Sequence, residues 1–364
     1  MEAGSVAEDR GEHSVQRRRF IKRLIVGIPI LAAASSLLAY LLASKPREES
    51  KSTTESLEQL ISYEVTPTNL FYAVSLDVVS PNLDASRWRL KVHGLVEEPM
   101  QFTLGDIKSM RSVGEYATLE CVSNPVGGDL ISNAYWRGVQ LKTLLELVKV
   151  KPNARYIVFR CFEGYSVGIP IEAALDEGTI LAYEMNYEPL TLEHGYPLRL
   201  IVPKYYGMMN PKWIVEIEVV DYTYLGFWQK LGWANEAEYQ THSTILVPGY
   251  SPLRRRFNLS QTPQQAKLGE RLQICGVAFA GERGISKVEV SLDDGVTWMR
   301  AKIRKPLSKY SWVLWWLDWV PEKVGVYRLM VRAVDGNGVQ QIGDLTEPYP
   351  EGATGYHTIV FRVE

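Results

Sequence analysis

Cysteine is scarce in this sequence of 364 residues, which holds three: Cys121, Cys161 and Cys275. They stand far apart and form no CxxC pair, which excludes a zinc or iron–sulfur site of the usual spacing and a dense disulfide framework. The sequence is compatible with a single disulfide bond between Cys161 and Cys275. The sequence also lacks a CxxCH motif for covalent haem attachment.

An excess of one charge sign is absent as well. Forty Lys and Arg residues oppose 42 Asp and Glu residues, which leaves a net charge of −2. Nothing in this balance creates the basic field that nucleic-acid binding requires, so we expect no nucleic-acid partner. The length and an apolar content of 46% predict two globular domains with additional segments.

One long apolar run is present near the N-terminus. The uncharged stretch LIVGIPILAAASSLLAYLLA fills 24–43 and would rise about 30 Å as a helix, enough to cross a bilayer. Before it, QRRRFIK (16–22) resembles a twin-arginine export signal. A plain signal anchor with a basic flank is the alternative. No A-x-A site or lipobox cysteine follows, so we expect a retained anchor and extracytoplasmic soluble domains.

Composition and periodicity divide the chain into six parts. The pattern predicts strands at 88–96 and 155–164 and a helix at 138–150, hence an α+β domain. Short strands with hairpin turns near the C-terminus predict an all-β immunoglobulin-like sandwich, whose tryptophans we expect to be packed. The expected parts are a basic N-terminal segment, a transmembrane helix, a flexible tether, the α+β domain, a linker and the sandwich, at 1–23, 24–43, 44–65, 66–250, 251–267 and 268–364.

The most informative stretch is ATLECVSNPVGG (117–128), in which an apolar strand ends in Cys121 before Asn-Pro and Gly-Gly. A buried structural thiol is one reading. A cysteine-hydrolase nucleophile is another, but none of the five histidines stands in a hydrolase signature. The third is a thiolate that binds a transition metal. A tight turn suits this third role because it holds the sulfur rigidly and lets a cofactor approach closely.

Three separated motifs favour the metal. LECVSNPVGGDLISNAYWRGVQLKTLLE (119–146) and HGYPLRLIVPKYYGMMNPKWIVEIEV (194–219) resemble the molybdenum-cofactor domain of the sulfite oxidase family. KVEVSLDDGVTW and RAVDGNGVQQ resemble the appended dimerisation domain of that family. The resemblance implies a molybdenum–molybdopterin (Mo-pyranopterin) cofactor, with Cys121 as the protein's molybdenum ligand. It also implies a homodimer formed through the C-terminal domain.

The same resemblance implies the remaining site residues. Tyr165 matches a tyrosine near the substrate and is expected to be catalytic together with Cys121. Trp136 either walls the cleft or packs in the core. The positions that match cofactor contacts are Asn69, Tyr72, Cys161, His194, Arg199, Asn210 and Lys212. Arg199 and Lys212 suit the pterin phosphate, because a guanidinium fork and an ammonium both bind phosphate oxygens.

Two departures from the family concern the substrate. Val74 and the pair Pro125-Val126 occupy places where sulfite oxidases carry basic residues. Because charged hydrogen bonds contribute about 1.5–3 kcal/mol each, we expect a small S-oxide or N-oxide rather than sulfite. Sulfite oxidation is the alternative, and a surface-anchored binding protein without the metal is an alternative of another class. No haem segment is present, so we expect a separate electron-transfer partner, such as a membrane haem protein or cytochrome.

Overall fold

The computed structural model describes residues 54–76 and 80–364. The expected basic segment and membrane helix lie outside these ranges and stay predictions. In the described ranges, no helix has both the length and the apolar character needed to cross a membrane. The last part of the expected flexible tether is helical instead: α2 (Thr54–Ile61) buries Leu60, because apolar residues recur on one face of this helix of about two turns.

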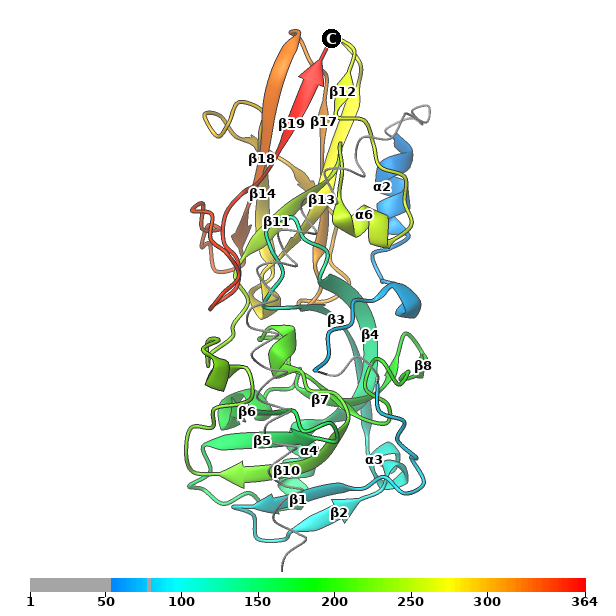
Figure 1. The fold of residues 1–364 in the computed structure, drawn as a ribbon, viewed down its shortest axis with the longest axis vertical. Helices are drawn as coiled ribbons and strands as arrows, with labels where there is room; N and C mark the ends of the chain where they lie inside the picture. The colour runs from blue at the N-terminus through cyan, green and yellow to red at the C-terminus, as the bar shows by residue number, and fades with distance from the viewer. Residues whose placement is uncertain (1–53, 77–79) are drawn as a thin grey trace, which may run out of the picture. The chain divides into compact units, whose positions relative to one another are not determined.

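The α+β domain contains two sheets (Figure 1). In the first, the order is β2-β1-β10-β5-β6, with β1 and β10 parallel and the other pairs antiparallel. The expected strands at 88–96 and 155–164 are confirmed as β1 and β5. The strands of this sheet are β1 (Leu90–Gly94), β2 (Met100–Phe102), β5 (Tyr156–Cys161), β6 (Ser166–Pro170) and β10 (Ile214–Val220).

The second sheet carries the cysteine. Its order is β3-β4-β7-β8, and β9 pairs with β7. Strand β3 ends at Glu120, opposite Ile131 at the start of β4, so 121–130 form the loop between two paired strands. The strands are β3 (Ser112–Glu120), β4 (Ile131–Gln140), β7 (Ile180–Met185), β8 (Glu188–Pro189) and β9 (Arg199–Ile201).

Helices in the described ranges are short. The helix expected at 138–150 begins three residues later as α4 (Leu141–Leu147), because 138–140 complete strand β4. A capping box formed by Thr103 and Asp106 begins α3. The other helices are α3 (Leu104–Ser109), α5 (Ile171–Ala174), α6 (Pro252–Arg256), and the 3-10 turns η1 (Thr68–Leu70), η2 (Gly207–Met209), η3 (Gln229–Leu231) and η4 (Gly281–Arg283).

The C-terminal part is a β-sandwich, as expected, and its strands run alongside one another in Figure 1. Trp312 and Trp315 are buried, which confirms a packing role for these two. One sheet has the order β11-β13-β17-β16: β11 (His242–Val247), β13 (Leu272–Phe279), β17 (Val313–Trp319) and β16 (Lys302–Ile303). The other has the order β12-β19-β18-β14-β15: β12 (Gln265–Ala266), β19 (His357–Val363), β18 (Gly325–Asp335), β14 (Ile285–Ser291) and β15 (Met299–Arg300).

The boundary between the two domains differs from the expected one. Strand β11 precedes residue 250, yet it pairs with β13 and so belongs to the sandwich. The expected linker, 251–267, contains α6 and β12. One hydrophobic cluster joins Phe159 and Leu200 of the α+β domain to Phe279 of the sandwich. The two domains therefore share a continuous core, and β11 lies where they meet.

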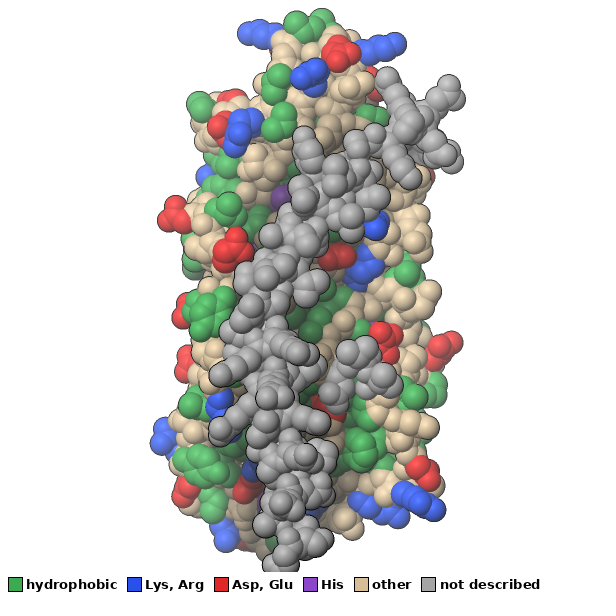
Figure 2. Space-filling view, in the orientation of Figure 1, with side chains coloured by type: hydrophobic (Ala, Val, Ile, Leu, Met, Phe, Trp, Pro, Cys, Tyr) green, Lys and Arg blue, Asp and Glu red, His purple; other side chains and the backbone are tan. Residues whose placement is uncertain are grey.

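Charges of both signs alternate over the described part of the face shown in Figure 2. Lys and Arg side chains stand among Asp and Glu side chains on this face. Exposed ion pairs in the described ranges include Lys302–Asp318 and Arg328–Asp294. Exposed pairs of this kind contribute little to stability. The visible charges form a mixed surface, which agrees with a net charge close to zero.

Candidate functional site

Cys121 lies at the first position of the loop that joins β3 to β4, and this loop is fastened by its own backbone. The Cys121 amide donates to the carbonyl of Leu130 at 2.9 Å, and the Asn124 amide donates to the carbonyl of Cys121 at 2.9 Å. The side chain is 9% exposed, and its Sγ lies 3.1 Å from Ser123 Oγ. Burial raises the pKa of the Cys121 thiol. A bound metal ion reverses this preference, because it stabilises the thiolate.

The side chains of Glu120 and Asn124 complete the loop. Asn124 Nδ2 donates to Glu120 Oε1 at 2.8 Å, and the Leu130 amide donates to Asn124 Oδ1 at 2.9 Å. A Cβ atom on Gly128 would lie 2.3 Å from Asn124 Oδ1, so only glycine leaves room for this bridge. Asn124 thus ties the start of the loop to its end, which explains the Asn-Pro and Gly-Gly pairs of the sequence.

Three tyrosines feel the charge of the Cys121 thiolate: Tyr165 and Tyr239 are buried, and Tyr72 is half-buried. Burial raises the pKa of Tyr72, Tyr165 and Tyr239, and the electrostatic influence of Cys121 adds to each shift. The Tyr165 hydroxyl donates to the carbonyl of Met208 at 2.5 Å, so its proton is already engaged. The structure thus brings the predicted residues Tyr72 and Tyr165 into the surroundings of Cys121 and adds Tyr239.

The second part of the site, which contains His194, Asn210 and Lys212, is built around the buried side chain of Arg199. Arg199, which is 5% exposed, donates to the carbonyls of His194 at 3.1 Å and Asn210 at 3.4 Å. Its guanidinium lies 4.8 Å from the ring centroid of Trp136. Burial lowers the pKa of Arg199 to about 10. Its Nε–H is buried without a hydrogen-bond partner among the described residues, so one donor of the fork remains to be satisfied.

Lys212 is the second cation of this part of the site. Its Nζ donates to Ser75 Oγ at 2.7 Å and to the carbonyl of Glu193 at 3.0 Å. Burial, followed by the charge of Arg199, lowers the pKa of Lys212 to about 7. A nearby anion would favour the protonated lysine again, because opposite charges stabilise each other in a buried site.

Asn210 has a scaffolding role within the same loop. Its Nδ2 donates to the carbonyls of Tyr205 and Tyr206, both at 3.0 Å, and its Oδ1 accepts the amide of Val202 at 2.6 Å. All of its side-chain polar atoms therefore have partners within the protein. Among the predicted cofactor contacts, Asn210 shapes the loop that presents Arg199 and Lys212.

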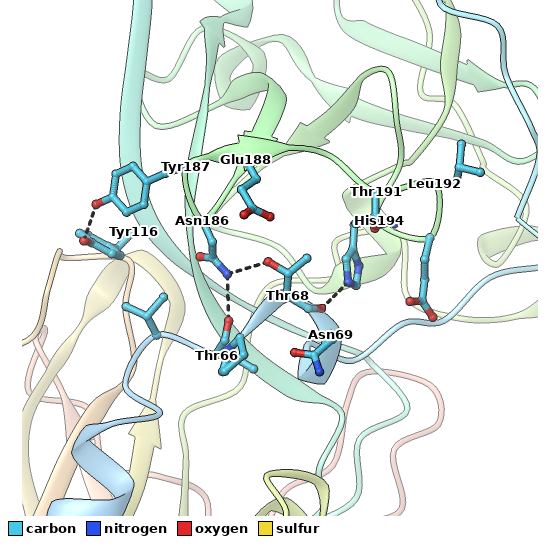
Figure 3. A pocket seen from close by; sticks show the side chains of 13 residues that line it. Thr66, Thr68, Asn69, Tyr116, Asn186, Tyr187, Glu188, Thr191, Leu192 and His194 are labelled. Carbon is cyan, nitrogen blue, oxygen red and sulfur yellow. Dashed lines mark hydrogen bonds between the residues drawn. The ribbon is translucent and has the colours of Figure 1, made fainter.

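His194 and Asn69 line a cavity of about 950 Å³ (Figure 3). His194 Nε2 lies 2.9 Å from the carbonyl of Thr68. A carbonyl only accepts, so Nε2 carries the proton and Nδ1 of the neutral ring is an acceptor. Burial lowers the pKa of His194 to about 4, which keeps the ring neutral at physiological pH. Asn69 offers both a donor and an acceptor from the neighbouring turn η1.

Cys161 ends strand β5 close to this site. Its amide donates to the carbonyl of Tyr165 at 2.9 Å, and its thiol is buried. Burial raises the pKa of the thiol, Glu163 raises it further, and Lys212 opposes both. All three cysteines are free thiols, so the open question of a Cys161–Cys275 disulfide is answered: no such bond is present.

His194 makes the acid stability of the protein testable. Its pKa falls from 6.5 to about 4 on folding, so the unfolded chain takes up the proton first. Stability is therefore lost as pH falls from about 6.5 to about 4, by up to about 3 kcal/mol at 1.4 kcal/mol per pKa unit. Urea unfolding at pH 7, 5.5 and 4 measures this loss. A His194→Gln variant should show a smaller loss, and an equal loss in both proteins would contradict the prediction.

The residues present fit a phosphate-bearing pterin cofactor. Arg199 holds a buried donor that lacks a partner, and Lys212 adds a second cation. A buried donor without a partner is unfavourable, and a phosphate oxygen would satisfy Arg199 Nε, with Lys212 as a half-buried second cation nearby. The neutral His194 ring and Asn69 supply the acceptors and donors that a polar heterocycle needs.

Four residues of this neighbourhood were missed by the sequence analysis: Glu120, Asn124, His242 and Arg256. Glu120 and Asn124 had a signal, since both stand beside the cysteine in an otherwise apolar strand and a tight turn. His242 and Arg256 had none, because they reach the site from the sandwich strand β11 and from helix α6 in the expected linker.

Comparison with known proteins gives two consecutive matches along the chain. Residues 77–228 match the oxidoreductase molybdopterin binding domain, and 258–346 match the Mo-co oxidoreductase dimerisation domain. The second match indicates a homodimer. The chain is 25% identical to the sulfane dehydrogenase SoxCD from Paracoccus pantotrophus, with a TM-score of 0.70 over 82% of this chain and 83% of that one.

Curated relatives of this chain are oxidoreductases as well. The uncharacterized oxidoreductase YuiH of Bacillus subtilis is 34% identical over 150 residues, which cover 41% of this chain and 74% of YuiH. The mitochondrial sulfite oxidase of Macaca fascicularis is 28% identical over 326 residues, with 78% of this chain and 58% of the relative covered. The chain thus spans little more than half the length of that relative. On its matched domains and its fold, the chain belongs to the sulfite oxidase family of molybdopterin-dependent oxidoreductases.

Proposed function

We propose that this protein transfers an oxygen atom from a small S-oxide or N-oxide at a molybdenum centre bound by Cys121. One observation carries the choice of substrate: the residue directly before Cys121 is the acidic Glu120, whose Oε1 accepts from Asn124 in the same loop. Negative charge beside the sulfur disfavours a doubly charged anion such as sulfite. The uncharged Val74, Pro125 and Val126 stand where the family pattern has cations.

The roles of the protein's residues follow from their contacts. Cys121 would supply the thiolate ligand from a loop fixed by Asn124. Arg199 and Lys212 would hold the phosphate end, and His194 Nδ1 would accept a hydrogen bond from the heterocycle. When bound, the cofactor supplies a two-electron couple between Mo(VI) and Mo(IV). The buried phenol of Tyr165 and the half-buried phenol of Tyr72 would wall the neighbourhood of the sulfur and limit the access of water.

The overall reaction balances simply. The S–O or N–O bond of the substrate breaks, two electrons and two protons are consumed, and the sulfide or amine leaves together with water. The electrons would come from a separate partner, such as a membrane haem protein or cytochrome. The proposal therefore places an electron-donating partner at the surface of the folded protein.

The test uses protein purified from a host that makes the cofactor. A reduced viologen dye reports reduction of dimethyl sulfoxide or trimethylamine N-oxide, and ferricyanide reports oxidation of sulfite. We expect kcat/KM for the best oxide to exceed that for sulfite by at least tenfold, since each missing charged hydrogen bond removes about 1.5–3 kcal/mol. Rapid sulfite oxidation without oxide reduction would contradict the proposal, and so would the absence of molybdenum and pterin.

Oxidation of a reduced sulfur compound is the second candidate. Its support comes from the relatives, since several are sulfite oxidases and one is a sulfane dehydrogenase. It would run the same chemistry in the opposite direction and deliver electrons to the partner. The ferricyanide assay of the same preparation distinguishes the two directions.

A charge-restoring variant tests the substrate argument directly. Val74 is 46% exposed and precedes Ser75, whose hydroxyl accepts from Lys212, so position 74 borders the site. Val74→Arg should lower the KM for sulfite about tenfold, because one charged hydrogen bond contributes about 1.5–3 kcal/mol. The effect should shrink in high salt. Val74→Gln is the matched neutral control, and an equal KM in both variants would count against the argument.

We further propose that the protein is anchored in the membrane with its soluble domains outside the cytoplasm. The support is the arginine pair Arg17-Arg18 followed by the apolar run 24–43. In a full-length chain, Arg17→Lys combined with Arg18→Lys should retain the protein in the cytoplasm if the twin-arginine route is used. Cell fractionation with protease accessibility measures this. Unchanged external protein in the double variant would favour a plain signal anchor.

A further inference from the structure

Two histidines from the sandwich contact the loop that carries Cys121. The first is His242, at the start of strand β11. Its Nδ1 lies 3.2 Å from Oε2 of Glu120, the residue directly before the cysteine, and both side chains are largely buried. The pair lies at ion-pair distance without hydrogen-bond geometry. Oε1 of the same carboxylate accepts from Asn124, so His242 adjoins the bridge that closes the loop.

The second histidine packs against the middle of the loop. A Cβ atom on Gly127 would lie 2.5 Å from both Cδ2 and Nε2 of His357, the first residue of β19. Nδ1 of this ring accepts the amide of Ile245 at 3.0 Å, so strand β11 fixes its orientation. Gly127 has a φ of +75°, which by itself favours glycine. The ring leaves no space for any side chain at this position.

A third contact fastens the far end of the loop. Arg256, from helix α6, donates to the carbonyls of Leu70 at 2.7 Å and Ile131, and to Ser132 Oγ at 2.8 Å. Its Nε lies 3.9 Å from Oδ2 of Asp129. These contacts join the loop and the first residues of β4 to the turn that precedes Tyr72.

We propose that His242 and His357 of the sandwich domain, with Arg256, are positioning residues that hold the Cys121 loop in register with the cofactor. His242 contacts Glu120 directly before the loop, His357 packs against Gly127 within it, and Arg256 lies near Asp129 at its end and bonds to the first residues of β4. The loop itself has no helix or strand between 121 and 130. Groups behind a metal ligand set its orientation and its affinity for the metal. The sandwich thus has a role in the site in addition to dimerisation. This inference rests on the proposed role of Cys121 as the metal ligand.

The test compares thiol reactivity in cofactor-free protein. Alkylation by iodoacetamide is followed at each cysteine by peptide mass spectrometry, so Cys161 and Cys275 report global opening in the same sample. We expect His242→Ala and His357→Ala to raise the alkylation rate of Cys121 about tenfold, because a looser loop opens more often. The rates of Cys161 and Cys275 should stay unchanged. His242→Gln, which keeps an N–H beside Glu120, should restore most of the protection.

The matched control is His93→Ala. His93 also pairs with a carboxylate, at 3.1 Å from Oε1 of Glu216, but it lies in strand β1 of the other sheet. An equal alkylation rate of Cys121 in His93→Ala, His242→Ala and His357→Ala would overturn the inference. An equal rise at all three cysteines would overturn it too, since the histidines would then act through global stability alone.

Metal-loaded protein gives the second readout. The electron paramagnetic resonance signal of its molybdenum, partially reduced to the Mo(V) state, should shift in His242→Ala and His357→Ala and return in His242→Gln. A change in alkylation without a spectral change would overturn the inference, because positioning must reach the metal ligand. Absence of molybdenum and pterin from the wild-type protein would instead contradict the proposed function, and it is measured independently of the alkylation rates.

Discussion

Replacing Cys121 by serine is expected to lower the oxygen-transfer activity by at least about 100-fold, because even the loss of a group behind a metal ligand costs 10–100-fold. The serine hydroxyl is far less acidic than a thiol, and the buried position already disfavours a negative charge there. The thiolate ligand is therefore lost while the fold of the loop stays, since both backbone hydrogen bonds of residue 121 remain. Activity, molybdenum content and the visible spectrum of the purified protein measure the effect.

Cys275→Ala is the control for this substitution. Cys275 is also a fully buried thiol, but it lies in strand β13 of the sandwich, away from the loop. We expect unchanged molybdenum content and a loss of about 1 kcal/mol in the free energy of unfolding, as for other small deletions in a core. A Cys121→Ser protein with full activity and an unchanged metal spectrum would refute the assignment of the ligand.

Replacing Arg199 by methionine is expected to reduce the affinity for the cofactor about 10- to 100-fold, since a charged hydrogen bond contributes about 1.5–3 kcal/mol. Methionine keeps the apolar contact with Trp136 but removes the free Nε donor and the charge. The variant also leaves the carbonyls of His194 and Asn210 without their donor. Pterin content per protein, measured by fluorescence after release and oxidation, reports the loss.

Arg254→Met separates this effect from a general loss of stability. Arg254 is another buried arginine, which donates to the carbonyl of Ser260 through Nε and Nη2. Its removal should lower the free energy of unfolding without changing the pterin content of the folded protein. Equal pterin content in the Arg199→Met and Arg254→Met proteins would contradict a phosphate role for Arg199.

The loop around Cys121 shows which features a sequence can reveal. The Asn-Pro and Gly-Gly pairs predict a tight turn, because the φ values and hydrogen bonds of a turn depend on residues within a few positions. The strand before it and the alternating strands of the sandwich follow from local periodicity in the same way. The N-terminal anchor rests on composition alone and stays a prediction.

The partners of that loop show what a sequence does not reveal. His357 is 112 residues from the amide that orients it, and Arg256 is 125 residues from the carbonyl of Ile131. Nothing local marks either side chain as part of the site. The sequence around strand β11 also did not indicate its domain, since only its pairing with β13 assigns it to the sandwich.

The sequence by itself determined the turn that holds Cys121 and the α+β and all-β characters of the two parts of the chain, because each depends on neighbouring residues. The cations at 199 and 212 were named by the family resemblance, and only strand pairing placed the boundary between the two domains. The tertiary structure alone decided that the Tyr165 proton is engaged by Met208 and that His194 Nε2 is engaged by the carbonyl of Thr68. It also brought His242 and His357 behind the cysteine. These features arise only when two domains bury a common core, which brings together side chains that are distant along the chain.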